Sequence, residues 1–364
     1  DWAWQTQTES QARTQLYRKW MPQVHVDLHE MSPNASYFFP PSAEPFHQTM
    51  TDWQRDFHKL AGKSHSKYFD KEGWLYFTSE TYDLFYPSYG DTWPTFNGAM
   101  GFTYEQGGSG RAGLGIRTNE GDTLTLNDRI AHHYTSSIST IDISFQQKDK
   151  LLEQFNAYFK QGMSKPSGAY KSYVIKAGNN PKSVEALLTL LDNQGIKYGY
   201  ASTGKNTAFV GFDYLKNGDG NFSLTDQDII VSAFQPRHHF VEVLFDPDPK
   251  LSDSLTYDMT AWALPYVYGL ETYATKERID VSGSTIGSEK INNTLPGKNS
   301  FAYLAEWNDT KDVRFLAAMM QKGIKARVSE KAFQLDGKNY EAGTLIITRK
   351  GNEHVVGGLG NTLV

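Results

Sequence analysis

The stretch Val24-His25-Val26-Asp27-Leu28-His29-Glu30-Met31 alternates apolar and polar residues. In a β-strand this alternation places the aliphatic side chains on one face and His25, Asp27 and His29 on the other. The turn-forming residues 32–34 (Ser-Pro-Asn) follow, so His29 is expected at the C-terminal end of the strand, where ligands of open α/β sheets gather. A histidine there, with a carboxylate two residues earlier on the same face, suits a metal ligand with an acidic partner. A solvated strand end would produce the same pattern.

Composition narrows the class of protein. A chain of 364 residues is long enough for two or three domains, and 39% hydrophobic with 21% charged residues is ordinary for a globular protein. The net charge of -5 gives no reason to expect nucleic acid or an anionic membrane as a partner, and no apolar run is long enough to span a bilayer. Without cysteine, disulfides and thiol nucleophiles are excluded. The chain starts at Asp1 with no targeting segment, so we expect it to be a piece of something longer.

The sequence of residues 1–165 predicts a mixture of helices and strands. We expect a loop over 33–47 and a Tyr-rich loop over 82–93. The apolar strand over 99–105 ends on Glu105 and breaks into a run of glycines. Helices are predicted over 6–20, 50–61 and 126–159, and strands over 24–31, 74–78 and 99–105.

The second part of the chain repeats one pattern twice. Residues 165–168 (Lys-Pro-Ser-Gly) read as a linker, which predicts domains over 1–165 and 166–364. Beyond it, strand, helix and a Gly-Ile-Lys turn occur near 170–197 and again near 301–325, each followed by a hairpin and an apolar strand. The order βαβ predicts a parallel sheet. We expect both copies to share one core, filled by a buried helix over 254–268 that carries Leu255, Trp262 and Leu264.

Reactive side chains follow two of the predicted strands in the first part. His29 ends one strand and Glu105 ends another, and the loop between them carries Tyr86 and Tyr89. Zinc-dependent hydrolysis needs metal ligands, a carboxylate that accepts a proton from the metal-bound water, and a donor for the oxyanion. A strand-end carboxylate that caps the next turn is the plainer interpretation of Glu105.

Three segments resemble the family of zinc carboxypeptidases, in particular its large bacterial members with a C-terminal extension. The resemblance implies an α/β catalytic domain with a mixed eight-stranded sheet, of which residues 1–165 would be the C-terminal half. For the second α/β domain, over 166–364, a class I amidotransferase-like fold is one candidate. The resemblance also implies one zinc ion. His29 matches the family's later zinc-binding histidine, Glu105 its general acid/base and Tyr86 its substrate-binding tyrosine. The three segments are 27–31 (Asp-Leu-His-Glu-Met), 86–93 (Tyr-Pro-Ser-Tyr-Gly-Asp-Thr-Trp) and 101–108 (Gly-Phe-Thr-Tyr-Glu-Gln-Gly-Gly).

The chain departs from the family at the other zinc ligands. A His-x-x-Glu pair precedes the later histidine in the family, whereas the segment 1–28 contains no such pair. The only His-x-x-Glu is 239–242 (His-Phe-Val-Glu), in a strand-like run where residues three apart point to opposite faces. We therefore expect one zinc ligand of three, and a chain that alone binds zinc weakly and hydrolyses nothing.

Other motifs carry less weight. The adjacent His132 and His133 lie about 100° apart on a helix, which favours a packed or solvated pair. Residues 217–226 are similar to a calcium-binding loop but are better explained as a hairpin turn. The glycine-rich segment 107–110 lacks the residues of a phosphate-binding loop. Nothing selects Arg111 or Arg117 as substrate ligands.

Taken together, the sequence predicts a secreted or periplasmic zinc metallocarboxypeptidase with a peptide or protein substrate, represented here by a segment that is inactive alone. The alternative is a catalytically silent peptide- or glycan-binding module, favoured by an aromatic content of 14%.

Overall fold

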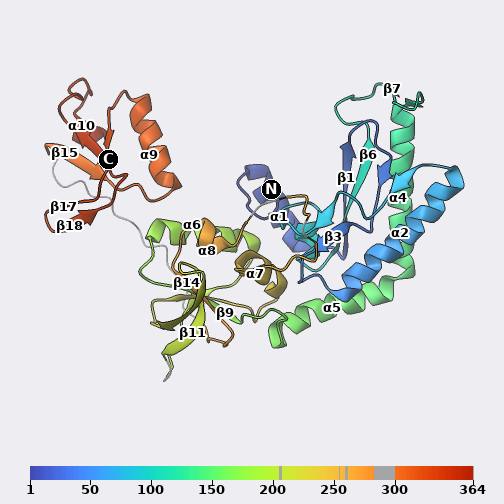
Figure 1. Cartoon of the computed structure of the whole chain (residues 1–364), viewed down its shortest axis with the longest axis horizontal. Helices are drawn as coiled ribbons and strands as arrows, with labels where there is room; N and C mark the ends of the chain where they lie inside the picture. Colours follow the sequence, from blue (N-terminus) through green and yellow to red (C-terminus); the bar gives the residue numbers. More distant parts are fainter. Residues whose placement is uncertain (205–206, 254, 259–260, 283–299, 364) are drawn as a thin grey trace. The chain divides into compact units, whose positions relative to one another are not determined.

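The computed structural model describes residues 1–204, 207–253, 255–258, 261–282 and 300–363. Helices and strands are interspersed along the chain, and the strands form several sheets, so the protein has an α/β fold, as predicted (Figure 1). The described residues form two compact units, one of residues 1–179 and 186–282 and the other of 180–185 and 300–363. None of the described helices is both long and apolar enough to span a membrane.

A mixed four-stranded sheet contains the stretch that the sequence singled out. Strand β1 (Val24–Met31) runs parallel to β6 (Met100–Gly107), and β6 pairs antiparallel with β2 (Tyr37–Phe38). Strand β4 (Tyr76–Phe77) adds to β2 in parallel, giving the order β1-β6-β2-β4. The strands predicted over 24–31 and 99–105 are therefore present and adjacent.

Two long helices pack beside this sheet. Helix α2 (Asp52–Glu72) starts at a capping box between Thr51 and Gln54, and helix α4 (Leu126–Gln146) starts at a similar one. The predicted helix over 126–159 is broken, because Gln147 leaves the helical conformation before α5 (Lys148–Ser164) begins.

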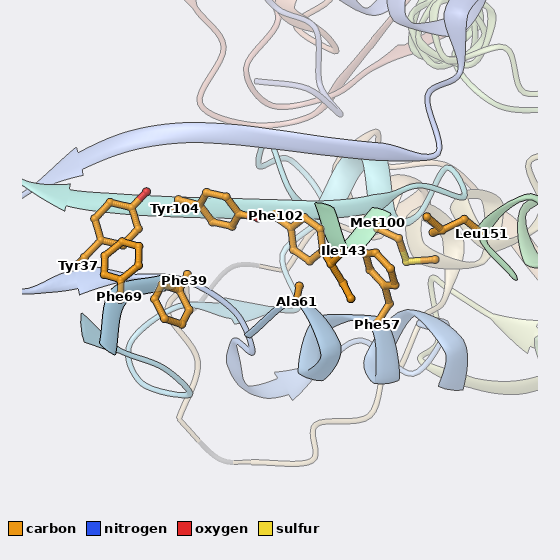
Figure 2. Close-up of a cluster of buried hydrophobic side chains, with 10 residues drawn as sticks. All are labelled: Tyr37, Phe39, Phe57, Ala61, Phe69, Met100, Phe102, Tyr104, Ile143 and Leu151. Atoms are coloured by element: carbon orange, nitrogen blue, oxygen red, sulfur yellow. The ribbon is translucent and has the colours of Figure 1, made fainter. Parts of the chain in front are cut away.

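Aromatic side chains fill the core of this part. Phe57 and Phe69 of α2 belong to one buried cluster with Phe102 and Tyr104 of β6 (Figure 2). In it Phe57 packs against Phe102, and Phe69 packs against Tyr37 and Phe39. The buried His65 bridges the helices and the sheet, because one ring nitrogen lies 2.9 Å from the Tyr104 hydroxyl and the other 2.7 Å from Ser139 Oγ of α4. Val24 and Val26 of β1 pack against the same cluster, so this side of β1 is the buried one.

The sheet that follows is antiparallel, which corrects the predicted parallel sheet. Strands β9 (Ser172–Ile175) and β10 (Gly199–Tyr200) are joined by α6 (Pro181–Gln194), but β13 (Ile229–Ser232) lies between them and is antiparallel to both. A βαβ order predicts a parallel pair only when no later strand enters the gap, and here one does. The remaining strands complete the order β10-β13-β9-β14-β11-β12: β11 (Ala208–Asp213), β12 (Gly218–Ser223) and β14 (Thr272–Thr275).

The repeat itself is confirmed. In the second copy, β15 (Ala302–Ala305), α9 (Thr310–Gln321) and β16 (Arg327–Val328) follow one another, and the later β19 (Leu345–Thr348) lies antiparallel between the two strands. The hairpin β17 (Phe333–Leu335) and β18 (Lys338–Tyr340) corresponds to the hairpin of the first copy.

The two copies have separate cores, so the expected shared core is wrong for the described residues. Val174 and Ile230 belong to one buried cluster, whereas Leu345 and Ile347 belong to another. The buried helix expected over 254–268 is wrong for most of the described residues, because only 264–267 are helical, and residues 254, 259 and 260 lie outside the described part. Leu255 is 79% exposed, whereas Leu264 is buried. The linker at 165–168 lies inside the first unit.

Contacts across that linker tie the first copy to the N-terminal part of the chain. The Trp93 indole donates to Gln194 Oε1 of α6 at 3.0 Å, and the Gln194 amide donates to the carbonyls of residues 2 and 3. Trp262 is buried, but against Phe85, with ring centroids 5.1 Å apart.

The remaining elements are short or peripheral: α1 (Thr8–Trp20), β3 (Ala43–Phe46), β5 (Asp83–Leu84), α3 (Thr92–Thr95), β7 (Ile116–Arg117), β8 (Thr123–Leu124), α7 (His238–Phe245), α8 (Leu264–Val267) and α10 (Leu359–Thr362).

Candidate functional site

The parallel register of β1 and β6 brings the predicted site residues together. His29 lies opposite Glu105, and Asp27 lies opposite Thr103. Because side chains alternate along each strand, all four project from the face of the sheet that α2 does not cover. The expectation that His29 and Glu105 lie on neighbouring strands and face one cavity is confirmed.

His29 lies between two carboxylates. Its Nε2 is 3.0 Å from Asp27 Oδ2, and its Nδ1 is 3.8 Å from Glu105 Oε1. The hydrogen bond to Asp27 raises the pKa of His29 above its ordinary value, against the opposing effect of partial burial. Burial works to raise the pKa of Asp27, but the bond to His29 and nearby positive charge outweigh it, so that this pKa is lowered. The pair therefore favours a charged carboxylate that orients the imidazole.

Glu105 is the least satisfied carboxyl group of the site. Its residue is only 8% exposed, and its Oε2 has no hydrogen-bond partner among the described residues. Burial raises the pKa of Glu105 to about 7, although the neighbouring His29 acts to lower it. A carboxyl group whose pKa lies near neutrality can both accept and release a proton, as a general acid/base must.

Asp91 is a site residue that the sequence analysis did not select. It precedes the short helix α3, and its Oδ1 accepts a hydrogen bond of 2.7 Å from the backbone N–H of Thr92. Burial raises the pKa of Asp91 to about 6, while a hydrogen bond with the Thr103 side chain opposes that shift. The available signal was its position after Tyr89-Gly90, where an aspartate ahead of a helical turn is a common cap.

A small cavity of about 130 Å³ opens onto these groups. Asp27, His29, Asp91 and Glu105 line it together with Asp83. Its other walls are formed by Thr103, by the backbone of Gly90 and by three tyrosines, Tyr82, Tyr89 and Tyr257.

Tyr86, the predicted substrate-binding tyrosine, does not line this cavity. Its hydroxyl accepts a hydrogen bond of 2.7 Å from the Trp4 indole, and its ring packs against Tyr89 and Trp262. Tyr89, three residues later, is the tyrosine of this loop that reaches the cavity, and its hydroxyl donates to Asp258. The role assigned to Tyr86 stays a prediction, and the geometry favours Tyr89.

The described residues do not form a complete zinc site. The resemblance implies three protein ligands, whereas no group of three histidine, cysteine, aspartate or glutamate side chains in the described part of the chain could hold a metal ion. Among the described residues, His29 is the only one of the implied ligands, and both of its ring nitrogens face carboxylates. This set alone does not fit a three-ligand zinc centre.

The other candidate motifs are structural. The His239-x-x-Glu242 pair lies on helix α7 and not in a strand, which corrects the strand-like interpretation. His132 contacts Gln106 and His133 contacts the Tyr37 hydroxyl, so both are packed, as expected. Residues 217–226 include the turn of the β11–β12 hairpin and are not a separate loop.

Comparisons with protein-family models, with curated proteins and with solved structures find no match to this chain. The family resemblance therefore stays a prediction based on three short segments.

Proposed function

We propose that this chain carries the proton-transfer part of a zinc-dependent metallocarboxypeptidase site, which hydrolyses a peptide bond near the C-terminus of its substrate. The observation that carries the proposal is Glu105, a buried carboxyl group with a pKa raised to about 7 and an unpartnered oxygen, beside His29 at a cavity. In this role Glu105 accepts a proton from the attacking water and returns it to the leaving amine.

The neighbouring residues position these groups. Asp27 holds the His29 imidazole through its Nε2, which fixes the ring orientation in the way a carboxylate partner does for metal-binding histidines. Zinc, held in part by ligands from outside the described residues, would supply the polarised water. Because those ligands are missing here, we expect the 364-residue chain alone to bind zinc weakly and to hydrolyse nothing.

The proposal is tested with the full product of the gene. If that product includes an upstream His-x-x-Glu, it is expected to bind about one zinc ion and to hydrolyse benzoyl-glycyl dipeptides. Glu105→Gln should then lower kcat by a factor of about 10²–10⁴ while metal content stays unchanged, since a glutamine cannot accept the proton. Glu153→Gln, at an exposed position of α5, is the matched control and should retain full activity.

Two outcomes would contradict the proposal. One is a Glu105→Gln enzyme with normal kcat, which would show that Glu105 is not the general acid/base. The other is tight stoichiometric zinc binding by the 364-residue chain, which would show that the described residues hold a complete site.

The aromatic walls of the cavity favour a second candidate, a silent peptide- or glycan-binding module. Tyr82, Tyr89 and Tyr257 place three rings at one cavity, and such rings are common where proteins contact ligands. If this second candidate is right, the full gene product binds peptide without hydrolysing it. Turnover is then zero in the wild type and in Glu105→Gln alike.

A further inference from the structure

Helix α4 presents an apolar face to solvent. Every exposed residue from position 129 to position 145 has an aliphatic or aromatic side chain, with between 38% and 67% of its surface accessible: Ile130, Tyr134, Ile138, Ile141 and Phe145. We call these five residues the α4 stripe. They follow one another at intervals of four, four, three and four residues, which keeps them on one side of the helix.

The buried face of the same helix is the polar one. Its buried residues are Arg129, Ser136, Ser139, Thr140 and Ile143. The three hydroxyl groups among them each lie 2.7 Å from a polar atom of a buried side chain, those of Tyr37, His65 and Tyr104. A surface helix of a single chain normally buries its apolar side and exposes its polar side. Helix α4 reverses this order, and a contiguous apolar surface of this kind marks an interaction site.

The spacing of the α4 stripe is complementary to itself. Measured from the point just before Ile138, Ile130 lies as far toward one end of the helix as Phe145 lies toward the other, and Tyr134 and Ile141 are related in the same way. Two antiparallel copies of α4 therefore bring each of these residues opposite its counterpart, with the two copies of Ile138 beside the two-fold axis. Most homodimers are two-fold symmetric and use the same patch on both chains.

The charges at the two ends of the stripe favour this antiparallel arrangement. The segment before it, 118–128, has three acidic residues and no basic one: Glu120, Asp122 and Asp128. The segment after it, 146–150, has two basic residues, Lys148 and Lys150, and one acidic residue. An antiparallel pair places the acidic end of each helix beside the basic end of the other, whereas a parallel pair would bring like charges together.

We propose that the α4 stripe is the interface of a two-fold homodimer, in which α4 packs antiparallel against α4 of a second copy of this chain. The inference does not rest on the proposed function. Thr140 of α4 contacts the Tyr104 hydroxyl, and Tyr104 projects from the face of β6 opposite to Glu105. A dimer through α4 therefore leaves the cavity of the candidate site open.

The first experiment measures the mass of the 364-residue chain in solution. Sedimentation velocity at tens of micromolar should give a species with twice the mass of one chain. Ile141→Glu should raise the dissociation constant of the dimer by about tenfold or more, because the dimer would bury a carboxylate without a partner. Leu16→Glu, at a 56% exposed position of α1, is the matched control and should leave the constant unchanged. A monomeric wild-type chain, or equal constants in the two variants, would overturn the proposal.

Disulfide cross-linking tests the orientation of the two helices. The chain has no cysteine, so each introduced cysteine is its only thiol. Ile138→Cys, beside the two-fold axis, should cross-link to itself in air. In Tyr134→Cys or Ile141→Cys alone the two thiols are about 10 Å apart along the helices, too far for a disulfide, but an equal mixture of these two variants should cross-link. Self-linking of Tyr134→Cys, or no link in Ile138→Cys, would refute the antiparallel pair.

The full product of the gene separates a second copy from any other occupant of the stripe. It should also sediment as a dimer, which Ile141→Glu dissociates. A monomeric gene product would mean that another part of it covers the stripe, and would refute the assignment. Neither measurement depends on hydrolysis, so a dimer without peptidase activity would refute the proposed function alone, and an active monomer would refute the dimer alone.

Discussion

His29 Nδ1 and Glu105 Oε1 lie 3.8 Å apart on neighbouring parallel strands, while Nε2 of the same imidazole lies 3.0 Å from Asp27 Oδ2. One ring thus faces a carboxylate on its own strand and another on the adjacent strand. The contact with Asp27 is shorter, and it is the main cause of the raised pKa of His29. This difference between the two carboxylates can be measured.

Asp27→Asn should lower the pKa of His29. The variant removes the charged hydrogen-bond acceptor that favours the protonated imidazole. Burial, which favours the neutral imidazole, then has the larger effect on the pKa. The measurement is an NMR titration of the histidine ring signals in the 364-residue chain. Asp149→Asn, at a 91% exposed side chain of α5, is the control and should leave the pKa of His29 unchanged. An unchanged midpoint in Asp27→Asn would mean that the hydrogen bond does not hold the proton.

How much of this site the sequence could predict depends on the range of the interactions. The alternation in 24–31 is local, so strand β1 and the shared face of Asp27 and His29 were predictable. The pairing of His29 with Glu105 followed from two strand ends meeting at one edge. Tyr257 reaches the cavity from a part of the chain far downstream of both strands, and no local pattern marks such a residue.

The predicted fold was wrong where a strand from a distant part of the chain joins the sheet. The order strand, helix, strand at 172–200 predicted a parallel pair, but β13, which follows both strands in the sequence, inserts between them. The run His238–Phe245 is apolar over most of its length and forms a helix that is buried from end to end. Periodicity cannot distinguish a short buried helix from a buried strand.

Glu242 of α7 should make the protein less stable as the pH rises. Burial raises its pKa to about 7 from an ordinary value of 4.5, and the neighbouring Asp246 adds to the shift. Between these two pH values the folded chain keeps a proton that the unfolded chain has released, so the stability that Glu242 contributes is lost as the pH rises through about 7.

Glu242→Gln should remove this dependence, because an amide has no proton to lose. Relative to the wild type, the variant is expected to gain about 2–3 kcal/mol between pH 5 and pH 8. Urea unfolding at both pH values measures the difference. Glu153→Gln, at a mostly exposed side chain, should show no such gain. A constant difference between wild type and Glu242→Gln at the two pH values would contradict the raised pKa.

Gly101→Ala should destabilise the sheet. A Cβ at this position of β6 would lie 1.9 Å from the Asp91 carbonyl oxygen and 2.7 Å from Thr95 Oγ1, and a backbone oxygen cannot move aside cheaply. We expect a loss of about 1–3 kcal/mol in the free energy of unfolding, measured by urea denaturation. Gly178→Ala, where no atom lies within 4 Å of the added methyl group, is the control and should be close to neutral. Equal stability of the two variants would show that the loop of Asp91 does not pack against β6 in this way.

Phe102→Ala should lower stability without changing the titration of His29. Phe102 is fully buried between Phe57 and His58 of α2, with ring centroids at 6.0 and 4.6 Å, so its truncation leaves a cavity that should cost about 3–5 kcal/mol. Its neighbours along β6, Thr103 and Gly101, project from the opposite face of the sheet, as does Glu105. Urea unfolding should therefore show the loss, while the NMR midpoint of His29 stays at its wild-type value.

The control for this last variant is Leu75→Ala, at a side chain that is 80% exposed and should change stability by less than about 0.5 kcal/mol. Two results would count against the arrangement of the two faces. A mild effect of Phe102→Ala would mean that the aromatic cluster is not the core of this sheet. A shifted His29 midpoint in that variant would mean that the core face and the cavity face of β6 are coupled, because repacking around α2 would then have moved Glu105 relative to His29.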